Sequence, residues 1–110
     1  LPALATPPDI AGMTSLANAM LKDALDAYVT GNTVLARDVI PRDAQVDAMN
    51  QAHQDALTDL MEAEPENIRR CRHLAVISKC LERIADHAKN VAEDAVLLHE
   101  AKDIRHAGGG

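Results

Sequence analysis

The stretch LAVISKCLERIADHAKNVAEDAVLL, residues 74–98, decides the fold. Apolar residues recur in it every seven positions. They form two interleaved rows: Leu74, Leu81, Ala88 and Ala95 in one, and Ile77, Ile84, Val91 and Leu98 in the other. Spacings of three and four residues are typical of a helix that packs lengthwise on other helices. We therefore predict a long helix over about 65–102, with both rows facing a core and a frayed tail over 103–110.

A second helix is predicted at the start of the chain, over about 7–30. Thr6 is a candidate N-cap, Pro7 fits the first helical position, and Asp9 favours the positive end of the helix dipole. Gly31 is expected to end this helix.

A third helix is predicted between these two, over about 33–63. Asn32 can cap its first turn. Pro41 lies inside it and removes one backbone hydrogen bond, so a kink is expected there. Pro65 then marks the first turn of the last helix. Because the connections are so short, successive helices should be antiparallel neighbours.

Composition supports an all-α fold. Hydrophobic residues make up 47% of the 110 residues, yet the chain has no Trp, no Phe and a single Tyr. A core of aliphatic residues and Ala suits closely packed helices better than a sheet. The prediction is one domain over 1–110, an antiparallel three-helix bundle with the up-down-up order of spectrin repeats.

The net charge argues against nucleic-acid binding. At −6, from 11 Lys and Arg against 17 Asp and Glu, the chain should repel nucleic acid, and its single Tyr offers little for stacking bases. No apolar run approaches the roughly 20 residues of a membrane span. Cys71 and Cys80 are about 13 Å apart along one predicted helix, too far for a mutual disulfide. A reduced, cytoplasmic setting is therefore predicted.

Two pairs of acidic residues are the candidate functional site. Asp43 with Asp47, and Glu82 with Asp86, are each four residues apart and so share one face of a helix. If the turn between their helices centres between Glu64 and Pro65, Asp43 lies opposite Asp86 and Asp47 opposite Glu82. Such hard oxygen ligands suit Mg, Mn, Ca or Fe.

Further residues extend this predicted metal site. Asn90 and Glu93 continue the stripe of Glu82 and Asp86, and His87 flanks it. The alternative is that the carboxylates form only a solvated acidic face of a structural module. His53 falls on an apolar stripe and is predicted to be a core residue rather than a ligand. No nucleophile–base pairing, nucleotide loop or Glu-x-x-His pair is present, so we predict no enzymatic activity.

The same segments carry a resemblance to a known family. The stretch LERIADHAKNVAE, residues 81–93, closing with DIRH at 103–106, resembles the last helix of PhoU proteins. ARDVI at 36–40, leading to Asp43 and Asp47, is similar to the family's middle helix, and EPENI at 64–68 to the start of its third. Family members are two tandem three-helix repeats, and this chain resembles one, most like the C-terminal half.

The resemblance implies a role in phosphate regulation. It implies a cytoplasmic accessory protein of the phosphate-specific transporter that helps repress the phosphate-starvation response. The implied partners are the transporter's ATPase and a phosphate sensor histidine kinase, and a homo-oligomer is a further expectation. The family's metal-binding motif maps onto Asp43, Asp47, Glu82 and Asp86. Lys89 departs from a purely acidic patch, because its positive charge could weaken a metal site.

Overall fold

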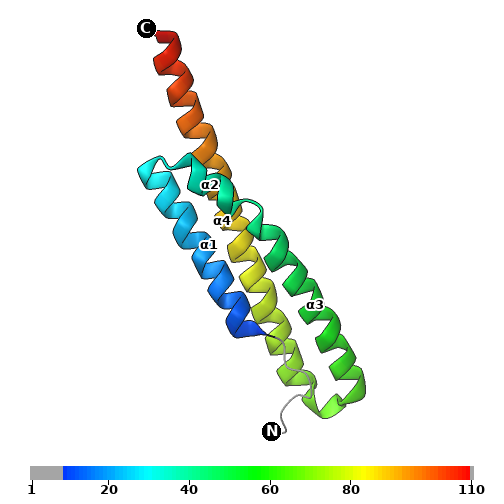
Figure 1. Cartoon of the computed structure of the whole chain (residues 1–110). Coiled ribbons are helices and arrows are strands. Elements are labelled where there is room, and N and C mark those ends of the chain that lie inside the picture. The colour runs from blue at the N-terminus through cyan, green and yellow to red at the C-terminus, as the bar shows by residue number, and fades with distance from the viewer. Residues whose placement is uncertain (1–8, 110) are drawn as a thin grey trace.

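The fold is a slender helical rod. The computed structural model describes residues 9–109, with side chains to residue 105, and extends 69 × 17 × 16 Å. In this part of the chain every regular element is helical: α1 (Ile10–Thr30), α2 (Thr33–Val39), α3 (Arg42–Ala63), a 3₁₀ turn η1 (Pro65–Asn67) and α4 (Ile68–Gly109). Figure 1 shows α1, α2 and α3 packed along α4, which continues past the other helices at its C-terminal end.

The contacts between helices establish an up-down-up order. Near one end of α1, Met13 lies against Ser78 of α4, and near its other end the Tyr28 carbonyl lies 3.2 Å from His99. These two helices are therefore parallel. On α3, His53 also contacts Ser78, and the later Gln54 reaches back to Ala75, so α3 is antiparallel to α4. The predicted antiparallel three-helix bundle is confirmed (Figure 1).

The predicted start of the first helix is wrong. The helix begins at Ile10, and Asp9 is its N-cap, with its carboxylate accepting a hydrogen bond from the Gly12 amide at 2.9 Å. This bond satisfies one of the amides left free in a first turn. Thr6 and Pro7, the residues predicted to begin the helix, lie outside the described residues.

Gly31 ends α1, as predicted. Its φ of 75° is left-handed, and its amide donates to the Ala27 carbonyl at 2.9 Å. A side chain here would also be crowded, because a Cβ atom would lie 3.0 Å from the His99 ring. Both the backbone conformation and the neighbouring helix therefore favour glycine.

The expected kink at Pro41 is a complete interruption. α2 ends at Val39 and α3 begins at Arg42, so the predicted helix over 33–63 is two helices. Pro41 has no amide to continue the ladder, although Ile40 keeps helical angles. Arg42 holds the junction, donating to Asp23 of α1 at 2.8 Å and to Asp38 of α2 at 2.6 Å.

The last helix is longer than predicted. The apolar rows stop at Leu98, which suggested an end near Lys102 and a frayed tail, but α4 continues to Gly109. No Pro or Gly interrupts the chain between Pro65 and Gly108, so no backbone signal ends the helix earlier.

One of the two predicted apolar rows lies at the edge of the core. Leu81, Ala88 and Ala95 are buried as expected, but Ile77 and Leu98 are 43% and 37% exposed. Ile84 and Val91 are only partly buried. Another row takes their place in the centre: Cys71, Ser78, Ala85 and Ala92, all at 0% exposure. The apolar pattern of the sequence did not reveal this row, because Ser and Ala are less hydrophobic than Ile, Leu or Val.

The interface of α1 with α4 is lined largely by alanine. Ala17, Ala24 and Ala27 of α1 are fully buried, as are four alanines of α4. Each Ala is the smallest residue with a Cβ, so the two helices can approach closely over their shared length. Any added volume there meets the backbone or Cβ atoms of the facing helix.

Replacing Ala88 by Leu should therefore destabilise the fold by about 1–3 kcal/mol, because the extra volume overpacks this interface. Ile84→Leu is the matched control: it conserves volume at a partly exposed position and should cost less than about 1.5 kcal/mol. Urea unfolding monitored by circular dichroism would measure both. Equal stability of the Ala88 variant and the wild type would contradict the close approach of α1 and α4.

Candidate functional site

The predicted metal ligands lie on neighbouring turns of α3 and α4. Asp43 is in the first turn of α3, with a side chain 18% exposed, whereas Asp47 is exposed. Across from them on α4, Glu82 and Asp86 are half-buried. The additional candidates His87, Asn90 and Glu93 are exposed.

Lys89 is a further neighbour of Asp43, in addition to the predicted Asp86. The Lys89 ammonium nitrogen lies 3.8 Å from Asp43 Oδ2, so the helix register places Lys89 beside Asp43. Asp86 and Asp47 are near enough to act on Asp43 electrostatically. Glu82 is not among the groups that perturb Asp43. The structure thus brings Asp43, Asp47 and Asp86 into one neighbourhood around a lysine.

Burial raises the pKa of Asp43 above its usual value, and the charges of Asp86 and Asp47 raise it further, while Lys89 opposes the shift. The other oxygen, Oδ1, is buried and has no hydrogen-bond partner among the described residues. A buried carboxylate oxygen without a donor is costly unless a cation or proton satisfies it. Asp43 is therefore the electrostatically strained member of the predicted site.

The donor chemistry fits a hard cation in part. Asp43 Oδ1 is available, and two further carboxylates are close, which suits Mg, Mn or Fe better than a soft metal. Among residues 9–105, however, no three His, Cys, Asp or Glu side chains are already arranged to hold a metal ion. Lys89 already lies near the other oxygen of Asp43, and the four-carboxylate site stays a prediction.

A second polar cluster lies inside the bundle. His53 Nδ1 is 3.0 Å from Ser78 Oγ, which in turn is 3.0 Å from Asn50 Oδ1. Gln54 donates to the same Asn50 oxygen at 3.1 Å and to the Ala75 carbonyl at 2.8 Å. Because an amide oxygen only accepts, Ser78 donates to Asn50, and His53 Nδ1 carries the proton that is donated to Ser78.

This cluster is structural. His53 is 7% exposed, which confirms its prediction as a core residue, and Ser78 is fully buried, so its hydroxyl has no access to a substrate. Ser78 and Asn50 were not predicted as members of such a cluster. The signal for Ser78 was its place between Cys71 and Ala85 in a seven-residue row.

The buried histidine makes stability depend on pH. Desolvation lowers the pKa of His53 below its ordinary 6.5, and the charge of Asp9 only partly opposes this. The folded state therefore holds His53 neutral while the unfolded state takes up a proton below about pH 6.5. Its contribution to stability is complete above pH 6.5 and is lost as pH falls towards the lowered pKa.

We expect the wild type to lose up to about 1.4 kcal/mol per pH unit in this window from His53 alone. His53→Gln removes the titration and should show a shallower decline between pH 7.5 and 5, whatever its stability at neutral pH. Urea unfolding across that range measures how steeply the free energy of unfolding changes with pH in the wild type and in the variant. Identical slopes would show that His53 is not buried in neutral form.

Comparison with known proteins places the chain in a family. The family model described as "PhoU domain" matches residues 10–95, from the first residue of α1 to well into α4. The chain belongs to the PhoU family. The match covers all the helix contacts described around Ser78 and Asp43, so these features lie inside the PhoU domain.

Individual relatives agree with this assignment. A phosphate-specific transport system accessory protein PhoU homolog of Caulobacter vibrioides is 43% identical over 81 residues, covering 74% of this chain and 35% of the relative. The homolog of Rhizobium meliloti is 39% identical over 82 residues, covering 74% and 34%. That of Clostridium acetobutylicum is 31% identical over 96 residues, covering 87% and 44%. The matched part is thus between about a third and a half of each of these relatives' length.

The PhoU-domain chain has no helix, within its described residues, that is long and apolar enough to cross a membrane.

Proposed function

We propose that this PhoU-family chain is a cytoplasmic phosphate-transport accessory and negative regulator of the phosphate-starvation response, acting by protein–protein interaction and not as an enzyme. The observation that carries the proposal is the family match over residues 10–95, together with relatives named as accessory proteins of phosphate-specific transport. The buried position of Ser78 and His53 supports a non-catalytic role.

The proposed partners are the ATPase of a phosphate ABC transporter and a phosphate sensor histidine kinase. A rod 69 Å long offers extended helix faces for docking. Several large apolar side chains are exposed on these faces, among them Leu25 and Tyr28 on α1 and Leu97 on α4. Such side chains are common anchors in protein interfaces and could also support a homo-oligomer.

Titration of the chain with the purified ATPase subunit of a bacterial phosphate transporter tests this proposal. We expect a complex with a Kd on the order of micromolar, as for transient regulatory interfaces, and no complex with the ATPase of an unrelated ABC transporter. Absence of binding both to the phosphate ATPase and to the cytoplasmic part of a phosphate sensor kinase would contradict the proposal.

We also propose that the carboxylate face binds a divalent or transition metal. Asp43, Asp47 and Asp86 would hold it, with Glu82 at the margin and the exposed Asn90, Glu93 or His87 as additional donors. The support is the buried, unpartnered Oδ1 of Asp43 and the two carboxylates that raise its pKa. When bound, the metal would supply positive charge that neutralises this cluster.

The alternative is a structural module whose acidic face is only solvated. The ion pair of Lys89 with Asp43 favours it, because a lysine already supplies the charge that a metal would bring. The two functions differ in their response to divalent ions, which provides a direct test.

Metal binding should raise the melting temperature. At a free Mn, Fe or Mg concentration a hundredfold above Kd, linkage stabilises the folded state by about 2.7 kcal/mol. Asp43→Asn with Asp86→Asn should abolish this effect, whereas Asp55→Asn with Asp59→Asn, an exposed acidic pair on α3, should retain it. Equal shifts from a divalent salt and from NaCl of matched ionic strength, in all three proteins, would favour the solvated face.

A further inference from the structure

The first part of α4 concentrates positive charge in an acidic protein. Residues 68–83 contain five of the chain's 11 Lys and Arg residues but only one of its 17 Asp and Glu residues. Like charges along one helix segment repel each other unless they serve to hold a counter-charge. The remainder of the chain is correspondingly more acidic, so the two signs are separated in space.

Most of these cations share one outward face with two apolar residues. We call it the basic face: Ile68, Arg69, Arg72, Val76, Lys79 and Arg83. Apart from the adjacent Ile68 and Arg69, successive members are three or four residues apart, which is the spacing of one helix face. All six are exposed; Ile68 and Val76, at 40% and 62%, are among the more exposed large apolar side chains. The face spans about 22 Å along the helix.

The basic face is hollowed rather than flat. One hollow of 620 Å³ is lined by Ile68, Arg69, Arg72 and Val76, and Glu66 is the acidic side chain among its described lining residues. A second hollow of 250 Å³ begins at Val76 and continues along Lys79 and Arg83. Val76 lines both, so the two hollows form one track along the helix.

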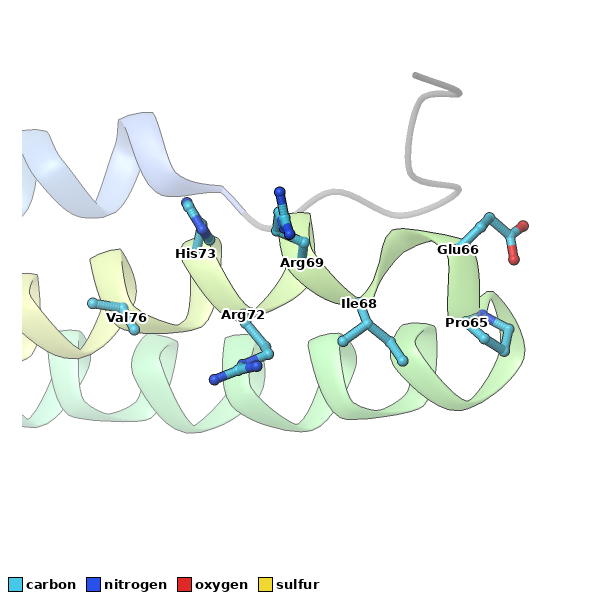
Figure 2. Close-up of a pocket in the computed structure, with 7 residues that line it drawn as sticks. All are labelled: Pro65, Glu66, Ile68, Arg69, Arg72, His73 and Val76. Atoms are coloured by element: carbon cyan, nitrogen blue, oxygen red, sulfur yellow. The ribbon is translucent and has the colours of Figure 1, made fainter.

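Figure 2 shows how the side chains border the first hollow. Arg69 and His73 point to one side of α4, and Arg72 and Ile68 point to the other, with Val76 further along the helix. The two guanidinium groups therefore flank the track from opposite edges. An occupant lying along it would meet positive charge on both sides and an apolar surface between.

The cations of the basic face are not engaged within the bundle. Among residues 9–105, the ion pairs of Lys22, Arg37, Arg42 and Lys89 lie outside the basic face. Exposed arginines with an apolar anchor between them are the composition that interfaces favour, because Arg both binds carboxylates in a bidentate manner and packs through its stem.

We infer that the basic face is a docking surface for an acidic amphipathic helix of a partner protein. Glutamates of that helix would pair with the Arg and Lys side chains at both edges, and two of its apolar residues would pack on Ile68 and Val76. A helix of about 16 residues matches the length of the face. The inference deepens the proposed function, since it rests on the chain acting through protein partners, and it assigns the surface and the charge of the partner segment.

The choice of occupant follows from charge complementarity. A nucleic acid would also be attracted to the arginines, but it would be repelled by the acidic remainder of the rod and has no apolar groups for Ile68 and Val76. A helix with one acidic and one apolar stripe complements both the arginines and the apolar side chains. Its carboxylates can all lie where it contacts the basic face, away from the acidic remainder of the rod.

The test uses a synthetic amphipathic peptide of about 16 residues, with Glu residues in one stripe of the helix and two Leu residues in a second stripe. A control peptide has Gln in place of every Glu. Fluorescence anisotropy should show that the wild-type chain binds the Glu peptide at least about tenfold more tightly than the Gln peptide, and that this preference declines as salt rises. Equal binding of the two peptides, or no binding of either, would overturn the inference.

Charge-matched variants locate the binding. Arg69→Glu, Arg72→Glu and Arg83→Glu together should weaken binding of the Glu peptide at least tenfold. The control Lys22→Glu, Lys102→Glu and Arg105→Glu changes the net charge equally at exposed positions and should have little effect. Equal loss in both would show attraction by overall charge alone and overturn the inference. Circular dichroism checks folding; if the first variant fails to fold, Arg72→Gln replaces it and should still weaken binding relative to Lys102→Gln.

The apolar anchor has its own control. Val76→Ser should weaken binding of the Glu peptide, whereas Val29→Ser, at an 81% exposed valine of α1, should not. A single-stranded oligonucleotide of equal charge that binds the chain as tightly as the Glu peptide would overturn the choice of a protein helix.

The same triple variants separate this inference from the proposed function. If the transporter ATPase binds the wild type and the Arg69, Arg72 and Arg83 variant equally well, the docking surface is wrong while the proposed function stands. If the Glu peptide binds as expected but neither the ATPase nor the sensor kinase does, the docking surface stands and the proposed partners are wrong.

Discussion

The close approach of α1 to α4 along their alanine residues is the constraint on which the rest of the structure depends. Ala17, Ala24 and Ala27 of α1 and Ala85, Ala88 and Ala92 of α4 belong to one core cluster, and all are fully buried. Small residues on both sides allow a short interhelical distance, but they contribute little buried apolar area per residue. The rod must therefore gain its stability from length, with many modest contacts repeated along α4.

A narrow core leaves polar side chains close to its centre. Ser78 lies in the central row of α4, fully buried and with its hydroxyl oxygen 3.5 Å from the Met13 sulfur. Its hydroxyl is satisfied by His53 and Asn50, so the cost of burying these groups is offset by hydrogen bonds. The same narrowness explains Asp43. Its carboxylate is partly withdrawn from water at the start of α3, and one oxygen finds no donor.

The surface carries two regions of opposite charge on the same helix. Towards its N-terminal end, α4 presents Arg69, Arg72 and Arg83, and one turn further it presents Asp86 beside the Asp43 cluster. A long helix makes this separation possible because its exposed face runs over many turns, so that different turns can carry opposite charges. The two charged regions do not overlap along the helix.

Much of the fold was predictable from the sequence because it depends on local signals. The all-α class, the stop at Gly31, the interruption at Pro41 and the start near Pro65 follow from backbone chemistry that acts within a few residues. The acidic pairs and the basic residues of α4 are equally visible in the sequence. The start of α1 and the end of α4 differ from the predicted ones, because Asp9 caps the first turn of α1 and no backbone signal ends α4 before its last residues.

Only the tertiary structure decided which row of α4 is central and which charge meets Asp43. Ile77 and Leu98 are more hydrophobic than Ser78 and Ala85, yet they lie at the edge, because the helices approach where side chains are small and not where they are most apolar. Asp86 and Lys89, one turn apart on α4, both lie near Asp43, but only the packing of the two helices shows that the Lys89 ammonium contacts its carboxylate. Sequence determines which residues share a helix face, but the packing distance and register between helices determine which of those faces meet.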